Sequence, residues 1–282
     1  MTSAALAIAR KEFEDAARSK LLWGLTLVLL LVTVPSFYGM TSTPFIDGAV
    51  DATEWLPGAF ENFVAPLAII AAYRAVVGER ESGSLRVLFG HPVTRRDVVA
   101  GKVLGRVALV GVVLLVATLG LGAAVVAAYG TIPARLFATM SAYVVAYGAV
   151  WTAVTVGVSA AAPSRLRAIA GMLGLFLFFG PFQLWRNLGV PLVALVVTGS
   201  ASTAGISQLD PSTWPTWYLY AQRLNPMRNF MMGREFVGSL ADPSIGYLGG
   251  IRVQLFGFAV LLAWAAVPLA VGYWRFERAD LT

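Results

Sequence analysis

The sequence predicts an all-α integral membrane protein with six transmembrane helices. Of its 282 residues, 58% are hydrophobic and only 13% are charged, and the mean hydropathy is +0.73. A soluble domain carries about a quarter charged residues, and a globule of this size could not bury so much apolar surface. Several runs without charged side chains also reach the ~20 apolar residues that a bilayer crossing needs. An ordinary water-soluble enzyme is therefore excluded.

Six stretches of the chain reach this length, and we interpret residues 1–282 as one transmembrane domain. The second stretch contains Glu61 near one end and Arg74 near the other, and charged side chains at helix ends can reach the membrane interface. The fifth is interrupted at Pro181, so we expect a broken span or a re-entrant piece beyond the break. The expected spans cover about residues 21–40, 56–77, 104–130, 136–161, 168–197 (broken) and 253–274.

Lysine and arginine gather in alternate loops, which predicts the orientation of the chain. The loop after the first span holds Asp47, Asp51 and Glu54 without a cation, and the loop after the third holds only Arg135. Because cytoplasmic loops carry an excess of Lys and Arg, we expect both termini in the cytoplasm and the protein in the cell membrane. The cationic segments contain Arg10, Lys11, Arg18, Lys20, Arg80, Arg86, Arg95, Arg96, Lys102, Arg106, Arg165, Arg167, Arg275 and Arg278.

The long segment 186–252 breaks this alternation, because it carries Arg223, Arg228 and Arg234. Long loops cross a membrane largely regardless of charge, so we place this segment on the extracytoplasmic side. Tryptophan and tyrosine beside prolines are typical of membrane interfaces, and we therefore expect re-entrant helices before the last span. The aromatic residues concerned are Trp214, Trp217, Tyr218 and Tyr220.

The first twenty residues have the period of an amphipathic helix. Apolar side chains recur at helical spacing, with charged residues between them. We expect this helix to lie on the cytoplasmic interface and to lead into the first span; a plain solvated segment is the alternative. No short apolar core precedes a small-residue cleavage site, so a cleavable signal peptide is not expected. The recurring apolar residues are Leu6, Ala9, Phe13 and Ala17.

The loop between the second and third spans, residues 79–102, carries the most informative pattern. Ser84 can cap a short helix that a glycine and a proline then end. Thr94 can cap a second helix, with Asp97 in the capping-box position. The first short helix would expose an apolar ridge to the cytoplasm, and a partner protein is the natural surface to cover it. The ridge comprises Leu85, Val87, Leu88 and Phe89.

Four pieces of the chain match one family pattern in order. They are Arg10-Lys11-Glu12-Phe13; Glu79, Glu81, Ser82, Gly83, Ser84 and Leu85, followed by Pro92, Val93, Thr94 and Arg95 and then by Gly101, Lys102, Leu104 and Gly105; Leu224-Asn225-Pro226 with Phe230; and Arg275-Phe276-Glu277-Arg278-Ala279-Asp280-Leu281. In these pieces the chain resembles the type 2 ABC exporter permeases, and within them the permease of nitrous-oxide-reductase maturation and its relatives. Ser84 and Thr94 are hydroxyl replacements that keep the capping chemistry.

The resemblance implies that loop 79–102 holds a coupling helix, which docks in a groove of a separate ATPase subunit. It also implies a dimer of permease chains, identical or different, with ATP and magnesium bound on the ATPase. The alternative is that the loop charges act only as topology determinants. Glu61, at the outer mouth of its span, is a candidate pathway residue. The implied coupling residues are Glu79, Arg80, Glu81, Ser82, Gly83, Ser84, Leu85, Arg86, Leu88, Phe89, Pro92 and Arg95.

Missing residues exclude several chemistries. The chain has no cysteine and one histidine, His91, so thiol catalysis and His-rich or thiolate metal sites are excluded. It contains no Gly-x-x-x-x-Gly-Lys-Ser/Thr phosphate loop, so we expect no cofactor on this chain and ATP hydrolysis on a partner. The net charge of +6 fits cationic cytoplasmic loops and membrane lipid rather than nucleic acid.

Two other classes of function stay open. A stand-alone secondary carrier would place ionisable residues near the middle of the membrane, and no carboxylate lies there in any expected span. A membrane-embedded enzyme, such as an intramembrane protease or lipid transferase, would need catalytic His, Asp or Glu residues within the spans, and the chain offers almost none. The permease interpretation is therefore preferred.

Overall fold

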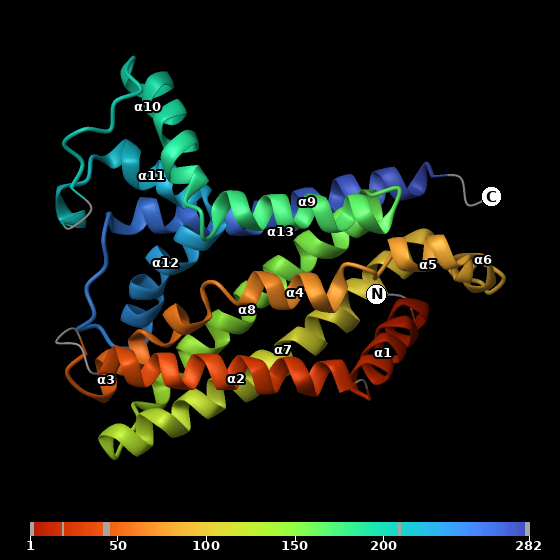
Figure 1. Cartoon of the computed structure of the whole chain (residues 1–282), viewed down its shortest axis with the longest axis horizontal. Helices are drawn as coiled ribbons and strands as arrows, with labels where there is room; N and C mark the ends of the chain where they lie inside the picture. Colours follow the sequence, from red (N-terminus) through yellow and green to blue (C-terminus); the bar gives the residue numbers. More distant parts are fainter. Residues whose placement is uncertain (1–2, 19, 42–45, 208–209, 280–282) are drawn as a thin grey trace.

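The computed structural model is an elongated bundle of helices, in which residues 3–18, 20–41, 46–207 and 210–279 are described. At one end of the bundle lie α5, α6, α1 and the C-terminal end of α13, and we call it the α5–α6 end. Helices α11 and α12 lie at the opposite end, which we call the α11–α12 end (Figure 1). The elements are α1 (Ser3–Ala17), α2 (Lys20–Thr41), α3 (Ala49–Glu54), η1 (Leu56–Phe60), α4 (Val64–Ala72), α5 (Val77–Ser82), α6 (Ser84–Leu88), α7 (Arg95–Tyr129), α8 (Ala134–Ala161), α9 (Arg165–Phe179), η2 (Trp185–Gly189), α10 (Val190–Thr198), η3 (Pro211–Thr213), α11 (Thr216–Leu224), α12 (Pro226–Ala241) and α13 (Gly250–Glu277).

Three of the expected spans are confirmed as continuous helices. Among the described residues, α7, α8 and α13 are long and apolar enough to cross a membrane. Two further segments, Ala49–Phe60 (α3 and η1) and Val64–Ser82 (α4 and α5), pass the same test together as one broken span. The two segments are bent by 43° relative to each other. Shorter apolar helices lie at Trp23–Gly39 and Trp185–Thr198. The number of crossings, six, stays a prediction.

The second expected span is not the continuous helix that its apolar run predicts. The chain leaves helical geometry between η1 and α4 and again between α4 and α5. At the second break, the hydroxyl of Ser159 in α8 accepts hydrogen bonds from the backbone N–H groups of Val76 and Val77, each at 3.2 Å. It donates to the carbonyl of Tyr73 at 2.8 Å. An interrupted helix at membrane depth needs such partners for its backbone, and one side chain on a distant segment supplies them.

The fifth expected span is broken where the proline predicts. Helix α9 ends at Phe179, and Gln183 has a positive φ of 52°, which no other described non-glycine residue shares. The chain then continues through η2 into α10, which turns away from the direction of α9 (Figure 1). Because α9 has 15 residues and a helix rises ~1.5 Å per residue, it is too short to cross a bilayer core alone.

Helices α11 and α12 form a V whose point enters the bundle (Figure 1). The carbonyl of Leu224, at the point, accepts a hydrogen bond from the indole of Trp264 at 3.1 Å, about halfway along α13. The side chain of Asn225 caps α12 and donates to the carbonyl of Phe179 at 2.8 Å. The two helices therefore form a hairpin that enters the bundle, and the expectation that it is re-entrant in the membrane stays a prediction. Its aromatic residues, by contrast, are largely buried: Trp214 and Tyr218 pack against α10 and α13.

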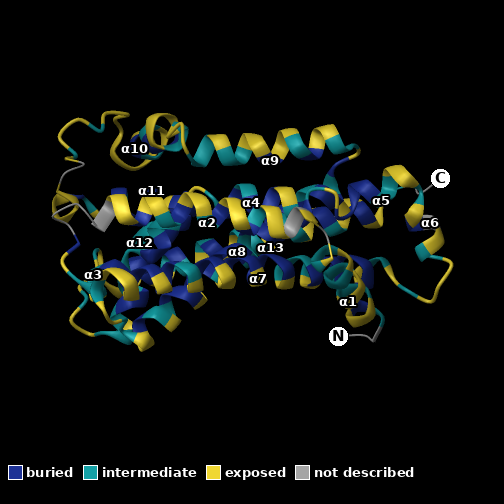
Figure 2. Ribbon diagram, turned by 60° about the horizontal axis from the view of Figure 1, so that its bottom comes forward, coloured by how far each residue is buried: buried dark blue, intermediate teal, exposed yellow. Residues whose placement is uncertain are grey.

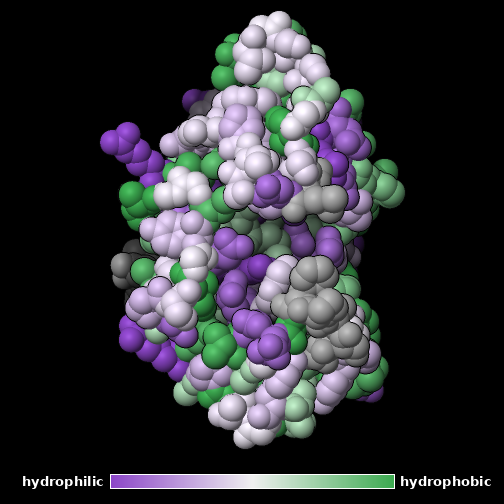
Figure 3. All heavy atoms as spheres, turned by 90° about the vertical axis from the view of Figure 1, so that its left-hand side faces the viewer, coloured by the Kyte–Doolittle hydropathy of each residue, from purple (hydrophilic) through white to green (hydrophobic). Residues whose placement is uncertain are grey.

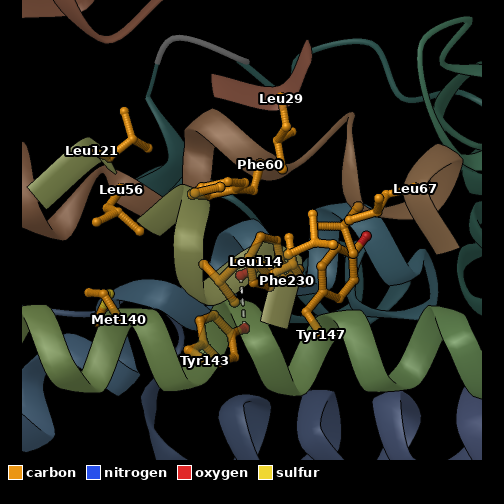
Figure 4. Packing of buried hydrophobic residues seen from close by; sticks show 14 of the residues in the cluster. Leu29, Leu56, Phe60, Leu67, Leu114, Leu121, Met140, Tyr143, Tyr147 and Phe230 are labelled. Atoms are coloured by element: carbon orange, nitrogen blue, oxygen red, sulfur yellow. Dashed lines mark hydrogen bonds between the residues drawn. The ribbon is translucent and has the colours of Figure 1, made fainter. Parts of the chain in front are cut away.

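The core is built around α8, whose residues are buried along most of its length (Figure 2). Tyr143 and Tyr147 stack on Phe230 of α12, with ring centroids 4.8 and 3.9 Å away. The hydroxyl of Tyr143 donates to the carbonyl of Phe230 at 2.9 Å (Figure 4). Helix α8 thus holds the V of α11 and α12 through large aromatic side chains, which bury more area than any others.

Two glycines allow α8 and α13 to touch through their backbones. A Cβ on Gly157 would overlap the backbone of Pro268, and a Cβ on Gly272 would overlap the backbone of Gly157. Small residues permit this close approach between helices in membranes, where packing rather than water exclusion drives association. The α8–α13 contact therefore depends on the absence of these two side chains.

We expect Gly157→Val to destabilise the protein by about 1–3 kcal/mol or more, because the added atoms force the two backbones apart. The measurement is the thermal unfolding midpoint in mild detergent. Gly174→Val is the matched control, since a Cβ there meets no atom within 4 Å. Equal midpoints for the two variants would contradict the proposed backbone contact.

Candidate functional site: a loop that joins helix ends, and a polar pocket

The loop predicted to hold a coupling helix forms two short helices joined at a glycine. Gly83 has a φ of 74° and both ends α5 and begins α6. We expected Ser84 to cap α6, but Gly83 takes the capping position and Ser84 is the first helical residue. The hydroxyl of Ser84 instead bonds to the carbonyl of Glu79 at 3.4 Å and to the hydroxyl of Ser82 at 3.0 Å. The capping box of Thr94 and Asp97 is confirmed and begins α7.

The expectation that Leu85 belongs to an exposed ridge is wrong. Its side chain is 1% exposed and packs in a cluster with Val76, Val98 and Phe276. The apolar side chain that α6 presents to the outside is Val87, which is 72% exposed, while Leu88 and Phe89 are partly buried against the same cluster. A helix of five residues can bury one face only, and the interior of this end of the protein takes the face that carries Leu85.

Two arginines of the loop bind the carbonyl ends of long helices. Arg80 donates to the carbonyls of Ala160 and Ala162, at the end of α8, over 3.1 and 2.9 Å. Arg95 donates to three carbonyls at the end of α13, which are those of Phe276, Glu277 and Ala279. The last carbonyls of a helix lack partners within it, and a cation there also complements the helix dipole. Both arginines therefore have a structural role at helix ends.

Two glutamates of the loop tie it to two further helices. Glu81 accepts a hydrogen bond from the backbone N–H of Arg165 at 2.7 Å and forms an ion pair with its guanidinium at 2.6 Å, at the start of α9. Glu79 forms an ion pair with Lys102 of α7 at 2.7 Å. The loop thus contacts the third turn of α7, the first turn of α9 and the ends of α8 and α13. We call the set Glu79, Arg80, Glu81 and Arg95 the loop junction.

Lys102 extends the loop junction to the N-terminal helix. Its side chain is 2% exposed and pairs with both Glu79 and Glu12, the latter at 2.6 Å. Glu12 also pairs with Arg106 at 2.6 Å. Burial alone would raise the pKa of Glu12, but the charges of Lys102 and Arg106 outweigh it and hold that pKa below its ordinary value,. A buried cation needs such partners, because an unpaired charge in the interior is costly.

Helix α1 is present as predicted, and of its four predicted apolar residues Ala9, Phe13 and Ala17 pack against the rest of the protein while Leu6 does not. Leu6 is 55% exposed, whereas Ala5, Ile8, Ala9 and Glu12 lie against α7. Two α7 glycines make this contact possible: a Cβ on either would lie within 2.8 Å of α1 atoms. These are Gly101 and Gly105. The predicted place of α1 on the membrane interface stays a prediction.

Three of the remaining predicted coupling residues lie on the outer surface of the loop. Ser82, Ser84 and Pro92 are exposed, together with Val87 and His91. Arg86 lies in α6, and its side chain is outside the described part of the structure. The predicted set therefore divides, because Glu79, Arg80, Glu81, Leu85, Leu88, Phe89 and Arg95 contact the protein itself, while Ser82, Ser84 and Pro92 belong to a small exposed surface with Val87 and His91.

The candidate pathway residue Glu61 lines a separate cavity of about 550 Å³. Three interruptions of helical structure meet there: the turn between η1 and α4, the break after α9 and the point of the α11–α12 V. At the α11–α12 end of the molecule, hydrophilic residues surround a hollow (Figure 3). Other lining residues include Asn62, Gln183, Arg186, Gln222, Asn225 and Arg228.

Gln222 is the most informative lining residue of this cavity. Its side chain is 2% exposed and lines the cavity without a hydrogen bond to any described residue. Buried amides are normally hydrogen-bonded, so the cavity supplies the polar contacts of this one. We call the cavity the polar pocket, and it is suited to a ligand or water with hydrogen-bonding groups.

A buried polar network next to the polar pocket escaped the sequence analysis. The guanidinium of Arg223, which is 1% exposed, donates to Asn229, to the carbonyl of Met232 and to the side-chain oxygen of Gln254 in α13. Asn229 in turn donates to the carbonyl of Gly257 at 2.7 Å. The sequence pattern indicates only a loop charge at Arg223. It fixes the V of α11 and α12 to the last long helix.

The described residues hold no group of three or more His, Cys, Asp or Glu side chains that could bind a metal ion.

Comparison with known proteins agrees with the sequence pattern. The model of the family described as ABC-2 family transporter protein matches residues 6–281. A protein of Pseudomonas aeruginosa named probable ABC transporter permease protein NosY is 32% identical over 285 residues, which cover 96% of this chain and 97% of that protein. A protein of the same name from Stutzerimonas stutzeri is 32% identical over 124 residues, covering 43% of this chain and 44% of its own length.

We expect Glu12→Gln to lower the free energy of unfolding by about 3 kcal/mol at neutral pH, because it leaves Arg106 and Lys102 short of a partner. The lowered pKa of Glu12 means that its contribution is present above the ordinary glutamate pKa of about 4.3 and is lost as the pH falls through the lowered value. The difference from wild type should therefore shrink in acid. Unfolding midpoints at pH 7 and in steps from pH 5 down to about pH 2, which passes through the lowered pKa, measure it.

The matched control is Glu14→Gln, on the same helix. Glu14 pairs with Arg10, but both side chains are largely exposed, and such surface pairs contribute little. A loss of stability with Glu14→Gln as large as with Glu12→Gln would show that the buried ion pairs do not hold α1 in place.

Proposed function

Because the chain belongs to the ABC-2 family of transporter proteins, we propose that it is the membrane subunit of an ATP-driven exporter. Its family and its apolar helices make it a multi-pass membrane protein and a transmembrane ABC transporter subunit rather than a catalytic enzyme. Family membership implies an ATPase partner and a pairing of permeases in general. We propose that ATP and magnesium act on that partner, and that two permease chains, identical or different, enclose the path.

The observation that carries this proposal is the loop junction. Four side chains of the loop bind four helices, α7, α8, α9 and α13, through ion pairs and hydrogen bonds. A force applied to the loop from outside is therefore passed to α7, α8, α9 and α13 together, because packed helices move as rigid bodies. In this proposal the ATPase subunit contacts the exposed surface around Val87, and its movement on binding ATP tilts the helices.

We also propose that the polar pocket belongs to the translocation path, with Glu61 as a lining residue. Polar groups inside a membrane protein are costly and mark substrate pathways, and irregular backbone at membrane depth is tolerated where it lines a cavity. The polar pocket combines both features. It lies beyond the loop junction, and α4 and α8 run between the two sites. A stand-alone carrier or a membrane-embedded enzyme remains the alternative function and would require no ATPase.

The docking surface can be tested by changing Val87. We expect Val87→Asp to reduce co-purification of the ATPase at least tenfold in mild detergent, because a charge replaces the most exposed apolar side chain of α6,. Membrane insertion and unfolding midpoint should stay at wild-type values. Leu85→Asp, by contrast, should lower the unfolding midpoint, since that side chain is buried.

Leu240→Asp is the matched control, because Leu240 is 58% exposed at the α11–α12 end. It should leave ATPase capture unchanged. Full capture by Val87→Asp, or equal loss with Leu240→Asp, would remove the α6 surface from the proposal.

The orientation can be tested with single cysteines, because the natural chain has none. We place the α5–α6 end and both termini in the cytoplasm and the polar pocket open to the opposite side. Ser244→Cys and Asn62→Cys should therefore react with a membrane-impermeant maleimide in intact cells. Ser82→Cys should react only after the membrane is permeabilised. The reverse pattern would overturn the orientation, and an unreactive Asn62→Cys would remove the proposed opening of the pocket.

A further inference from the structure

A second cavity lies between the helices at the α5–α6 end and differs from the polar pocket in its chemistry. Its volume is about 310 Å³. Most of its walls are aliphatic, and two arginines, Arg74 and Arg106, are its charged lining residues. The walls come from α1, α2, α4 and α7, and include Leu25, Leu67, Ile70, Leu109 and Val113. We call this cavity the apolar crevice.

The two arginines stand at one end of the apolar crevice. Leu67 precedes Arg74 by seven residues along the α4 segment, and Val113 follows Arg106 by seven residues along α7. A helical rise of ~1.5 Å per residue separates each pair by about 10 Å. Helix α4 approaches the α5–α6 end and α7 leaves it. Both arginines therefore lie toward that end, and the aliphatic wall extends from them toward the middle of the bundle.

The cations of the apolar crevice have unused hydrogen-bonding capacity. Arg74 is exposed, and its side chain forms no hydrogen bond or ion pair with any described residue. Arg106 binds Glu12 and the carbonyl of Ala71, but its Nε is buried and has no partner among the described residues. An arginine offers five donors in a planar fork that suits phosphate groups. The exposed guanidinium of Arg74, at the edge of an apolar wall, is thus available to an anion, and Arg106 adds a second positive charge to the same cavity.

We propose that the apolar crevice binds one anionic phospholipid, with its phosphate on Arg74 and Arg106 and an acyl chain along the aliphatic wall. The chemistry of the crevice matches such a molecule at both ends. Basic pockets between helices on the cytoplasmic side are where anionic headgroups bind. The crevice also opens to the surface, since Ile70 is 41% exposed. A free phosphate or a soluble anion would leave the aliphatic wall uncovered.

The site lies next to the ion pairs of the loop junction. Arg106 shares Glu12 with Lys102, and Lys102 also pairs with Glu79 of the loop. A lipid phosphate on Arg106 would therefore act on the same ion pairs that hold α1 against α7. This inference rests on the proposed orientation, with the α5–α6 end on the cytoplasmic side, but it requires no ATPase, so it stands or falls independently of the proposed exporter role.

The test measures lipid retention by native mass spectrometry of the purified full chain. The protein is incubated with equimolar phosphatidylglycerol and phosphatidylcholine of identical acyl chains. We expect the wild type to retain one phosphatidylglycerol in preference to phosphatidylcholine. Arg74→Gln should lower that retention about fivefold, since each cation near the membrane surface contributes a factor of this size. Arg74→Lys should restore part of it.

Arg167→Gln is the matched control, because it removes one exposed cation from the same end of the molecule. It should leave retention unchanged, and Ile70→Trp, which fills the crevice, should lower it. Glycerol phosphate without acyl chains should not displace the lipid. Equal retention of the two lipids, equal loss in the Arg74→Gln and Arg167→Gln variants, full retention in Ile70→Trp, or displacement by glycerol phosphate would each overturn the proposal.

Discussion

The constraint on which the structure depends is that backbone groups at helix ends and breaks must find partners where water is scarce. Side chains from distant segments meet it here. Arg80 and Arg95 bind the final carbonyls of α8 and α13, and Ser159 binds both sides of the α4–α5 break. The residues that complete these helix ends lie in or beside one loop. The loop is consequently part of the bundle, and it cannot move without its helices.

Close backbone contact and buried charge work together around this loop. Gly101 and Gly105 let α1 lie directly on α7, and that approach places Glu12 beside Lys102. Neither feature would serve alone, since a buried lysine without carboxylates is costly and surface ion pairs contribute little. The same logic applies at the other end, where Arg223 is buried only because Asn229 and Gln254 surround it. Ionic groups therefore fix the positions of the α1 and α11–α12 segments.

The sequence predicts features that depend on neighbouring residues. Long apolar runs predict α7, α8 and α13, Pro181 predicts the break after α9, and the Thr94 capping box is confirmed, as is the family. Features that depend on pairing across the chain are missed. Leu85 has the spacing of an outward ridge, yet it is buried by residues of α7 and α13. Glu12 and Lys102 are 90 residues apart, so no local sequence pattern could show that their side chains form a buried ion pair.

The loop junction and the polar pocket are joined by continuous packing along α8. At one end, Ser159 and the carbonyl of Ala160 hold the α5 segment. At the other end, Tyr147 stacks on Phe230, which follows the pocket residues of α12 closely in sequence. Helix α4, which begins beside Glu61, is interrupted on both sides. In the proposed transport mechanism, α4 tilts at these interruptions while α8 stays straight, and a push on the loop thereby changes the shape of the pocket.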